Sequence, residues 1–185
     1  MSSSLNSCIA EGPASGRRRV LMLALAALPA LLWPLPAAAS TEVLVGMKRW
    51  GQGSFRRFGF LVYEATLWAG DDPLQPPLAL RLDYKRTIRG RAIAEASVEE
   101  MRRFVGNESQ LSAWGEQMQR IFPDVTPGDH LTGVYRDGVA RFYQGDRLLG
   151  IIDSPGFAEA FFAIWLDPRT SAPGLRADLL KREAV

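Results

Sequence analysis

The hydrophobic pattern divides the chain into an uninterrupted apolar run near its start and a longer part in which strand and helix periods alternate. Residues 20–39 hold no charged side chain and are rich in Leu and Ala, whereas apolar and polar positions are mixed from residue 40 onward. The two parts therefore call for different interpretations, and the periodic part is the one that predicts a folded domain.

Two segments early in the periodic part have the pattern of strands. Residues 58–68 form a run of apolar and aromatic positions, which predicts a strand. After a proline-rich loop at residues 71–77, the segment from Leu78 to Tyr84 alternates between apolar and polar residues. A period of two with one apolar face predicts a second, half-buried strand.

Strand patterns return in the second half of the chain. Residues 131–136 and 139–143 flank Asp137-Gly138, which is a strong signal for a two-residue hairpin turn. Residues 148–152 follow after another polar turn. Tight hairpins require antiparallel pairing, so these three strands predict an antiparallel sheet.

Between the two strand groups, the apolar spacing changes to that of helices. Ser97-Val98-Glu99-Glu100 has the form of a capping box, which predicts that a helix begins at Ser97 and ends at Gly106. Asn107 is expected to cap a second helix, which Pro123 ends.

Two more helices are expected near the C-terminus. Ser154-Pro155 predicts the start of a helix over residues 157–166, with the serine hydroxyl as its cap. That segment is apolar on almost every side, so it is expected to be buried. A last short helix carries Leu175, Leu179 and Leu180. About three strands, two helices, three strands and two helices predict an α+β fold with helices on one face of a sheet.

The first 39 residues have the layout of a signal peptide for export from a bacterium. Arg17, Arg18 and Arg19 precede the apolar run, which ends in three alanines before Ser40. Basic, apolar and then small residues favour cleavage after residue 39 and a periplasmic product. The alternative is a transmembrane anchor, against which three prolines in the run argue. The arginines leave both the general secretory and the twin-arginine route open.

Residues 40–185 then form one domain with restricted chemistry. Cys8 is the only cysteine and lies before the apolar run, so the domain would have no disulfide or thiolate. Three arginines and one glutamate leave with the first 39 residues, so 19 basic and 19 acidic side chains remain. This balance argues against nucleic acid as a partner. With His130 as the only histidine, we expect no metal and no cofactor.

Two sets of polar residues near the first predicted strand are candidates for function. Glu64 lies inside the strand, where it needs a partner such as arginine unless it faces solvent. Arg49, Arg56 and Arg57 precede the strand and Tyr63 lies within it. Arginine with tyrosine binds carboxylates through charge-assisted hydrogen bonds, although surface arginines beside a core tyrosine give the same pattern.

Several motifs, in this order and at this spacing, resemble the bacterial chalcone isomerase-like domain family. They are Gly51-Gln52-Gly53, Val62 to Trp68, Leu80 to Arg86, Gly150 to Asp153, Phe157 to Leu166, Pro168 to Ser171, and Leu175-Arg176. The resemblance covers almost all of residues 40–185. It implies an open-faced β-sandwich of the α+β class, in which a large antiparallel sheet and a helical layer enclose a cleft.

The resemblance also implies which activity is absent. The plant enzymes of the family use an arginine, a threonine, a tyrosine, an asparagine and a late hydroxyl residue to close a flavanone ring. Here Arg56 could supply the arginine, but the threonine position falls on Tyr63 and the late hydroxyl near Leu175. Residues 89–97 contain neither tyrosine nor asparagine. A fatty-acid-binding branch uses an arginine with a tyrosine, which Arg56 and Tyr63 resemble more closely.

We therefore expect an exported, non-catalytic domain that binds a fatty acid or another small apolar carboxylate. The expected ligand-binding residues are Arg56, Tyr63, Phe60, Trp68 and Trp165, with Arg49 and Arg57 as alternatives to Arg56. One alternative is an isomerase or lyase with Arg56 as electrophile and Tyr63 as acid–base. The other is a protein-interaction module without a ligand. No membrane span is expected after cleavage.

Overall fold

The computed structural model describes residues 43–181 of the chain. Cys8, the apolar run and the predicted cleavage site after residue 39 all lie outside the described residues. Export and processing therefore stay predictions.

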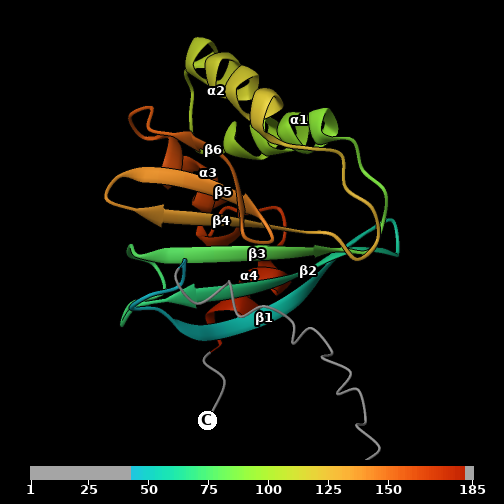
Figure 1. The fold of residues 1–185 in the computed structure, drawn as a ribbon, viewed down its shortest axis with the longest axis vertical. Coiled ribbons are helices and arrows are strands. Elements are labelled where there is room, and N and C mark those ends of the chain that lie inside the picture. Colours follow the sequence, from blue (N-terminus) through green and yellow to red (C-terminus); the bar gives the residue numbers. More distant parts are fainter. Residues whose placement is uncertain (1–42, 182–185) are drawn as a thin grey trace, which may run out of the picture. The chain divides into compact units, whose positions relative to one another are not determined.

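Six strands form one antiparallel sheet whose spatial order is the order of the sequence. They are β1 (Lys48–Arg57), β2 (Phe60–Ala69), β3 (Leu78–Tyr84), β4 (His130–Arg136), β5 (Val139–Gln144) and β6 (Arg147–Ile152). The four helices found in residues 43–181 are α1 (Gly90–Met101), α2 (Glu108–Ile121), α3 (Phe157–Leu166) and α4 (Pro173–Leu180). Figure 1 shows the sheet with its helices, and the predicted α+β class and element order are confirmed.

The helices pack on one face of the sheet, which we call the inner face. One row across all six strands belongs to it, namely Gly51, Leu67, Leu80, Gly133, Phe142 and Gly150. A Cβ atom at Gly51 would lie 2.5 Å from the carbonyl oxygens of Asp178 and Leu179 in α4. A Cβ at Gly133 would lie 3.5 Å from the Phe161 ring of α3. Glycine in the row thus lets the helices approach the strands closely.

The core lies between this inner face and α3. Eight of the ten residues of α3 are buried, as its sequence predicted. The rings of Phe122, Phe142, Phe157 and Phe161 contact one another, with centroids 5.0 to 6.2 Å apart. This aromatic cluster fixes α3 against the middle of the sheet.

The sequence pattern predicts about three strands before the first helix but does not locate the first of them, β1. Glycines at positions 51 and 53 interrupt its alternation, and two register shifts mark bulges in its pairing with β2. The predicted strand over residues 58–68 is β2, which begins at Phe60. Residues Phe58 and Gly59 instead form the turn between β1 and β2, both with positive φ.

One predicted helix start and one predicted helix cap were wrong. Ser97 lies inside α1, where its hydroxyl donates to the Ile93 carbonyl (2.9 Å), because the helix already begins at Gly90. The N–H of Gly90 is bound by Asp124 from a distant loop, a partner that local sequence does not reveal. At α3 the cap is Gly156 with φ 76°, and the Ser154 side chain bonds Gln117 instead.

Two other local predictions were confirmed. The Asn107 side chain accepts a hydrogen bond from the Gln110 N–H (3.1 Å) and caps α2. Asp137 and Gly138 form the tight turn between β4 and β5, with φ 55° and 76°. Both the cap of α2 and the turn between β4 and β5 are determined by residues next to these elements in the sequence.

Candidate functional site

Two tyrosines lie side by side on the inner face, at the end of the sheet where the chain turns from β1 to β2. Tyr63 of β2 pairs in register with Tyr84 of β3, and their ring centroids are 6.0 Å apart at 71°. Phe55 of β1 stacks on Tyr63 at 5.0 Å. The period of two places all three rings on the face that the helices cover.

The hydroxyl of Tyr63 is held by α3. The indole Nε1 of Trp165 donates a hydrogen bond to this oxygen over 3.0 Å. A phenol accepts and donates, so this contact leaves the Tyr63 proton available. Within the described chain, that proton has no acceptor.

The hydroxyl of Tyr84 has no hydrogen-bond partner among residues 43–181, although its side chain is only 2 % exposed. No fully buried side-chain nitrogen or oxygen in the described chain lacks a partner. The Tyr84 oxygen is therefore not a fully buried atom without a partner. Trp165, Tyr63 and Tyr84 thus form what we call the tyrosine cluster, with two donor protons that the described chain does not use.

Burial keeps both phenols neutral. Desolvation raises the pKa of Tyr63 well above its ordinary value, more than the hydrogen bond from Trp165 lowers it, and the Glu100 carboxylate adds a smaller upward shift. Burial likewise raises the pKa of Tyr84, with a further contribution from Tyr63. Removing these groups from water disfavours the phenolate, so both remain protonated donors.

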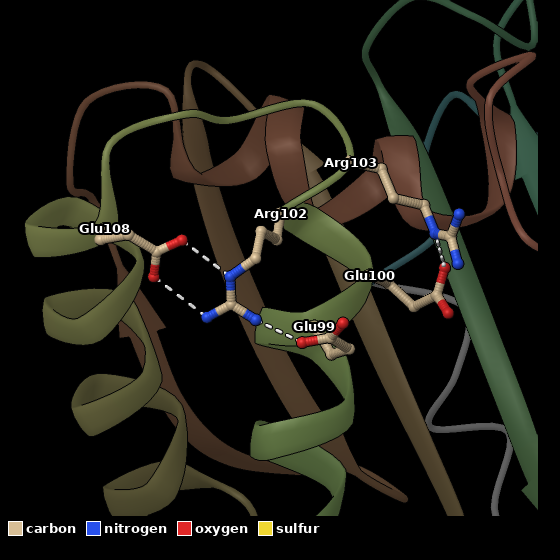
Figure 2. A network of polar contacts seen from close by, with 5 residues as sticks. All are labelled: Glu99, Glu100, Arg102, Arg103 and Glu108. Atoms are coloured by element: carbon tan, nitrogen blue, oxygen red, sulfur yellow. Dashed lines mark hydrogen bonds and ion pairs between the residues drawn. The ribbon is translucent and has the colours of Figure 1, made fainter.

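Charged residues at the C-terminal end of α1 lie near the tyrosine cluster. Glu100, which acts electrostatically on Tyr63, pairs with Arg103 over 3.1 Å. Figure 2 shows Arg103 and its partner pointing away from α2, whereas Arg102 reaches toward it. Arg102 pairs with Glu108 of α2 over 2.7 Å and also with Glu99. Arg103 is therefore linked to the cluster indirectly, through its ion pair with Glu100.

The structure brings only two of the five predicted site residues together. Tyr63 and Trp165 are joined by the hydrogen bond from the indole N–H. Arg56 is exposed near the turn between β1 and β2, where its guanidinium bonds the Gly59 carbonyl over 3.5 Å. Phe60 is also exposed, with the Arg86 guanidinium 4.4 Å above its ring. Trp68 faces the opposite side of the sheet, which we call the outer face.

The outer face of the sheet carries paired charges and a histidine. Glu64, whose surroundings the sequence left open, is exposed and pairs with Lys85 over 2.7 Å. Asp83 pairs with Arg81 over 2.6 Å and lies opposite His130 in the register. Desolvation lowers the pKa of His130 most, followed by the charge of Arg81.

Two cavities can be described, and neither contains the tyrosine cluster. The first lies on the outer face and is lined by Val43, Leu44, Trp68, Arg81, His130, Thr132, Tyr143 and Gly145. The second, of about 410 Å³, lies between α1 and α2 and is lined mostly by polar side chains that include Arg102 and Glu108. None of Arg49, Arg56 and Arg57 lines either cavity. The predicted pairing of Arg56 with Tyr63 stays a prediction.

Sequence reasoning missed three residues of this region, namely Tyr84, Glu100 and Arg103. Tyr84 had a signal, since it ends the strictly alternating strand on its apolar face. Glu100 and Arg103 had no such signal in the sequence. Their spacing of three residues in a helix predicts an ion pair between them, but it does not predict that Glu100 lies near Tyr63 of β2. Residues 43–181 hold no group of three or more His, Cys, Asp or Glu side chains that could bind a metal ion. In the same range, no helix is long and apolar enough to cross a membrane.

Comparisons with known proteins agree with this architecture. The family model described as chalcone isomerase-like matches residues 53–181 of the chain. A crystal structure of a fatty-acid binding protein from Arabidopsis thaliana has a TM-score of 0.56 and 14 % sequence identity. The match covers 74 % of this chain and 87 % of the plant protein, and it shows a common fold. A search of curated protein sequences finds no match. The family match extends over most of the chain, and the chain is therefore a member of the chalcone isomerase-like family.

Proposed function

We propose that this protein is a non-catalytic binding protein for a fatty acid or another small apolar carboxylate. The observation that carries the proposal is the tyrosine cluster, where two phenol protons have no acceptor in the described chain. A carboxylate offers only acceptors at neutral pH, so it is the complementary head group. The likeness to a fatty-acid binding protein of the same fold supports this choice.

The head group would accept from Tyr63 and Tyr84. Hydrogen bonds in which the acceptor is charged are shorter and stronger than neutral ones, so two phenols supply a specific anchor. Arg103 would supply positive charge from α1, in exchange for part of its pairing with Glu100 (3.1 Å). An arginine at this position offsets the cost of removing the carboxylate from water.

The apolar part of the ligand would lie against aromatic rings. Phe55 stacks on Tyr63 and is only partly buried, so its ring offers a wall beside the head group. Burying a methylene contributes about 0.8 kcal/mol, which is roughly fourfold in affinity. Affinity should therefore rise with chain length until the tail no longer fits beneath the helices.

The raised pKa values support binding rather than acid–base catalysis by these residues. A tyrosine that acts as a general base must ionise near the working pH, and burial opposes this for both Tyr63 and Tyr84. Neutral phenols remain good hydrogen-bond donors. This reasoning favours the binding role over an isomerase or lyase that would use Tyr63 as its base.

Calorimetric titration with hexanoate, decanoate and palmitate, each paired with its methyl ester, tests the proposal. Tyr63→Phe and Tyr84→Phe should each weaken carboxylate binding about tenfold or more, since a hydrogen bond to a charged group contributes about 1.5 to 3 kcal/mol. Neither change should affect the much weaker ester binding to the same degree. The matched control is Tyr143→Phe on the outer face, which should leave the affinity unchanged.

Two results would contradict this assignment. Equal affinity for acids and esters would show that no head-group site exists. Carboxylate binding that survives the double change Tyr63→Phe with Tyr84→Phe would place the site elsewhere. If Arg56→Ala weakens acid binding and Arg103→Ala does not, the anchoring cation is Arg56, as the sequence alone predicts.

We also propose that the domain acts after export. The basic run at residues 17–19, the apolar run and the alanines before Ser40 support this. Expression in a bacterium followed by fractionation should give a periplasmic protein whose mass corresponds to a start at or near Ser40. An intact Met1 together with retention in the membrane fraction would overturn the export proposal and leave the binding proposal untouched.

A further inference from the structure

The turn between β1 and β2 combines exposed aromatic rings with arginines. Phe58 and Phe60 are 87 % and 58 % exposed, which are the two largest exposed fractions among the large hydrophobic side chains of residues 43–181. The Arg57 guanidinium lies 5.5 Å from the Phe58 ring centroid and that of Arg86 lies 4.4 Å from Phe60. Together with Arg56, these residues form what we call the aromatic tip.

The backbone of the aromatic tip makes its sequence unusual. Phe58 and Gly59 both have positive φ (51° and 81°), as the two-residue turn of a twisted hairpin requires. Asparagine, aspartate and glycine adopt this conformation readily, whereas a bulky side chain rarely does. The turn between β4 and β5 has the expected Asp137 and Gly138 in the same conformation. Phenylalanine thus occupies position 58 although neither the backbone geometry nor core packing favours it there.

Basic side chains outnumber acidic ones around the aromatic tip. Arg56 and Arg57 precede the turn, and four more basic side chains lie in residues 84–94, which hold no acidic residue. Lys85 and Arg91 are neutralised by Glu64 and Glu95, each over 2.7 Å. Within residues 43–181, no ion pair is made by the other four, namely Arg56, Arg57, Arg86 and Arg89. The aromatic tip therefore combines unpaired positive charge with the exposed rings of Phe58 and Phe60.

We propose that the aromatic tip docks the protein on an anionic lipid bilayer. The exposed phenylalanines would enter the interfacial region, and the unpaired arginines would contact acidic head groups. A bilayer fits better than a protein partner or nucleic acid, because two separate aromatic side chains are exposed at and beside a narrow turn among unpaired arginines, and neither of them lines either cavity described above. The inference goes beyond the proposed binding function and does not depend on it.

The aromatic tip lies at the same end of the sheet as the tyrosine cluster, so docking by the tip would bring the cluster close to the bilayer. Tyr63 and Tyr84 lie at the same end of the sheet as the turn from β1 to β2, whereas the turn from β4 to β5 lies at the opposite end (Figure 1). The N–H of Lys85 bonds the Val62 carbonyl (2.9 Å), which ties the tip to the end of β3. A protein docked by this tip holds the tyrosine cluster close to the bilayer, from which an apolar carboxylate could transfer.

Vesicle flotation with the full chain tests the proposal. Wild-type protein should bind vesicles that contain phosphatidylglycerol more tightly than pure phosphatidylcholine vesicles, and added salt should weaken this binding. Arg57→Gln should reduce the affinity for anionic vesicles about fivefold. Phe58→Asn should reduce it at least as much, and asparagine suits the turn, so the variant should fold.

Matched controls come from exposed residues elsewhere. Arg120→Gln, at the end of α2, and Leu74→Ser, in the loop between β2 and β3, change an exposed arginine and a 48 % exposed apolar residue. Both should leave vesicle affinity unchanged. Equal losses for the tip variants and their controls would overturn the proposal, because they would indicate unspecific adsorption.

A site-specific probe locates the contact. Cys8 is the only cysteine, so Cys8→Ser combined with Phe58→Cys or with Asp137→Cys carries a single environment-sensitive fluorophore. Addition of anionic vesicles should shift the emission of the position-58 label to the blue and leave the position-137 label unchanged. Vesicle binding without a shift at position 58 would show that residues 1–42 or another surface bind the membrane, and the proposal would be wrong. Decanoate binding in solution should persist in Phe58→Asn, which separates this inference from the proposed function.

Discussion

Neighbouring residues on β2 and β3 face opposite sides of the sheet and have opposite chemistry. Glu64 and Asp83 on the outer face are each paired with a basic side chain, at 2.7 and 2.6 Å. Tyr63 and Tyr84, one position along on the inner face, are neutral and have hydroxyl protons without an acceptor in residues 43–181. The two carboxylates on the solvent-facing side are thus paired within the protein, whereas the two phenol protons on the helix-covered side have no acceptor in residues 43–181. Phenol protons without an acceptor in residues 43–181 can be donated to a ligand, which is why they mark a candidate site.

The largest expected difference between the two faces is in how much a substitution lowers the free energy of unfolding. Gly51→Ala places a Cβ on the inner face 2.5 Å from two carbonyl oxygens of α4, whose backbone cannot move aside freely. We expect the free energy of unfolding to fall by about 3 kcal/mol. Ser54→Ala on the outer face of the same strand should change it by less than about 0.5 kcal/mol. Denaturant midpoints measure both, and equal midpoints would contradict the packing of α4 on β1.

Removing either inner hydroxyl distinguishes the roles of the two tyrosines. Tyr63→Phe leaves the Trp165 indole N–H without its acceptor, so the free energy of unfolding should fall by about 2 kcal/mol. Tyr84→Phe removes a hydroxyl that has no partner in residues 43–181 and should be close to neutral. Thermal and chemical unfolding of the two variants gives the comparison. A stability loss in Tyr84→Phe as large as that in Tyr63→Phe would mean that the Tyr84 proton is bound within the protein.

Alkaline pH should destabilise the inner face. The folded-state pKa of Tyr84 is raised by burial, so above about pH 10 the unfolded chain releases a proton that the folded chain retains. Stability therefore falls as pH rises, by at most about 1.4 kcal/mol per pH unit for this tyrosine. Tyr84→Phe should flatten the decline, and Tyr143→Phe should not. A decline that both variants leave unchanged would show that other groups cause it.

Mild acid should act on the outer face, with a smaller effect. Burial and the charge of Arg81 lower the pKa of His130, so the unfolded chain takes up a proton more readily than the folded chain. Stability is therefore complete above about pH 6.5, the ordinary pKa of histidine, and declines as pH falls below it. His130→Gln should remove that part of the decline. The histidine is only partly buried, so screening keeps the effect below that of the buried tyrosine.

Much of the fold could be predicted from the sequence because its signals are local. The turn at Asp137-Gly138 and the cap at Asn107 are fixed by residues within the element they shape. The start of α1 is fixed by Asp124, which is 34 positions away from Gly90, and the sequence pattern placed the start at Ser97 instead. β1 was not located for a related reason, since its glycines at positions 51 and 53 suit close contact with α4 and interrupt the strand period.

In the candidate site, too, residues with a local sequence signal were predicted, whereas contacts between distant segments were not. Tyr63 and Trp165 could be selected because aromatic residues with polar groups stand out within apolar segments. Their hydrogen bond spans 102 positions, and only the fold brings the two together. Trp68 was expected in one ligand site with Tyr63, although a period of two places residues at odd and even positions of one strand on opposite faces. Helix-to-strand proximity, which brings Glu100 near Tyr63, has no signature in the sequence.

The central claim is that Tyr63 and Tyr84 bind the head group of an apolar carboxylate. The chain contains four tyrosines, so protein labelled with ¹³C at the tyrosine Cζ gives a spectrum with four assignable signals. Titration with decanoate should move the signals of Tyr63 and Tyr84 in a saturable way, because their hydroxyls gain an acceptor. The signals of Tyr135 and Tyr143 should stay in place, and methyl decanoate should move none of the four by a comparable amount. A titration in which the signals of Tyr63 and Tyr84 do not respond, or respond equally to acid and ester, would contradict the account.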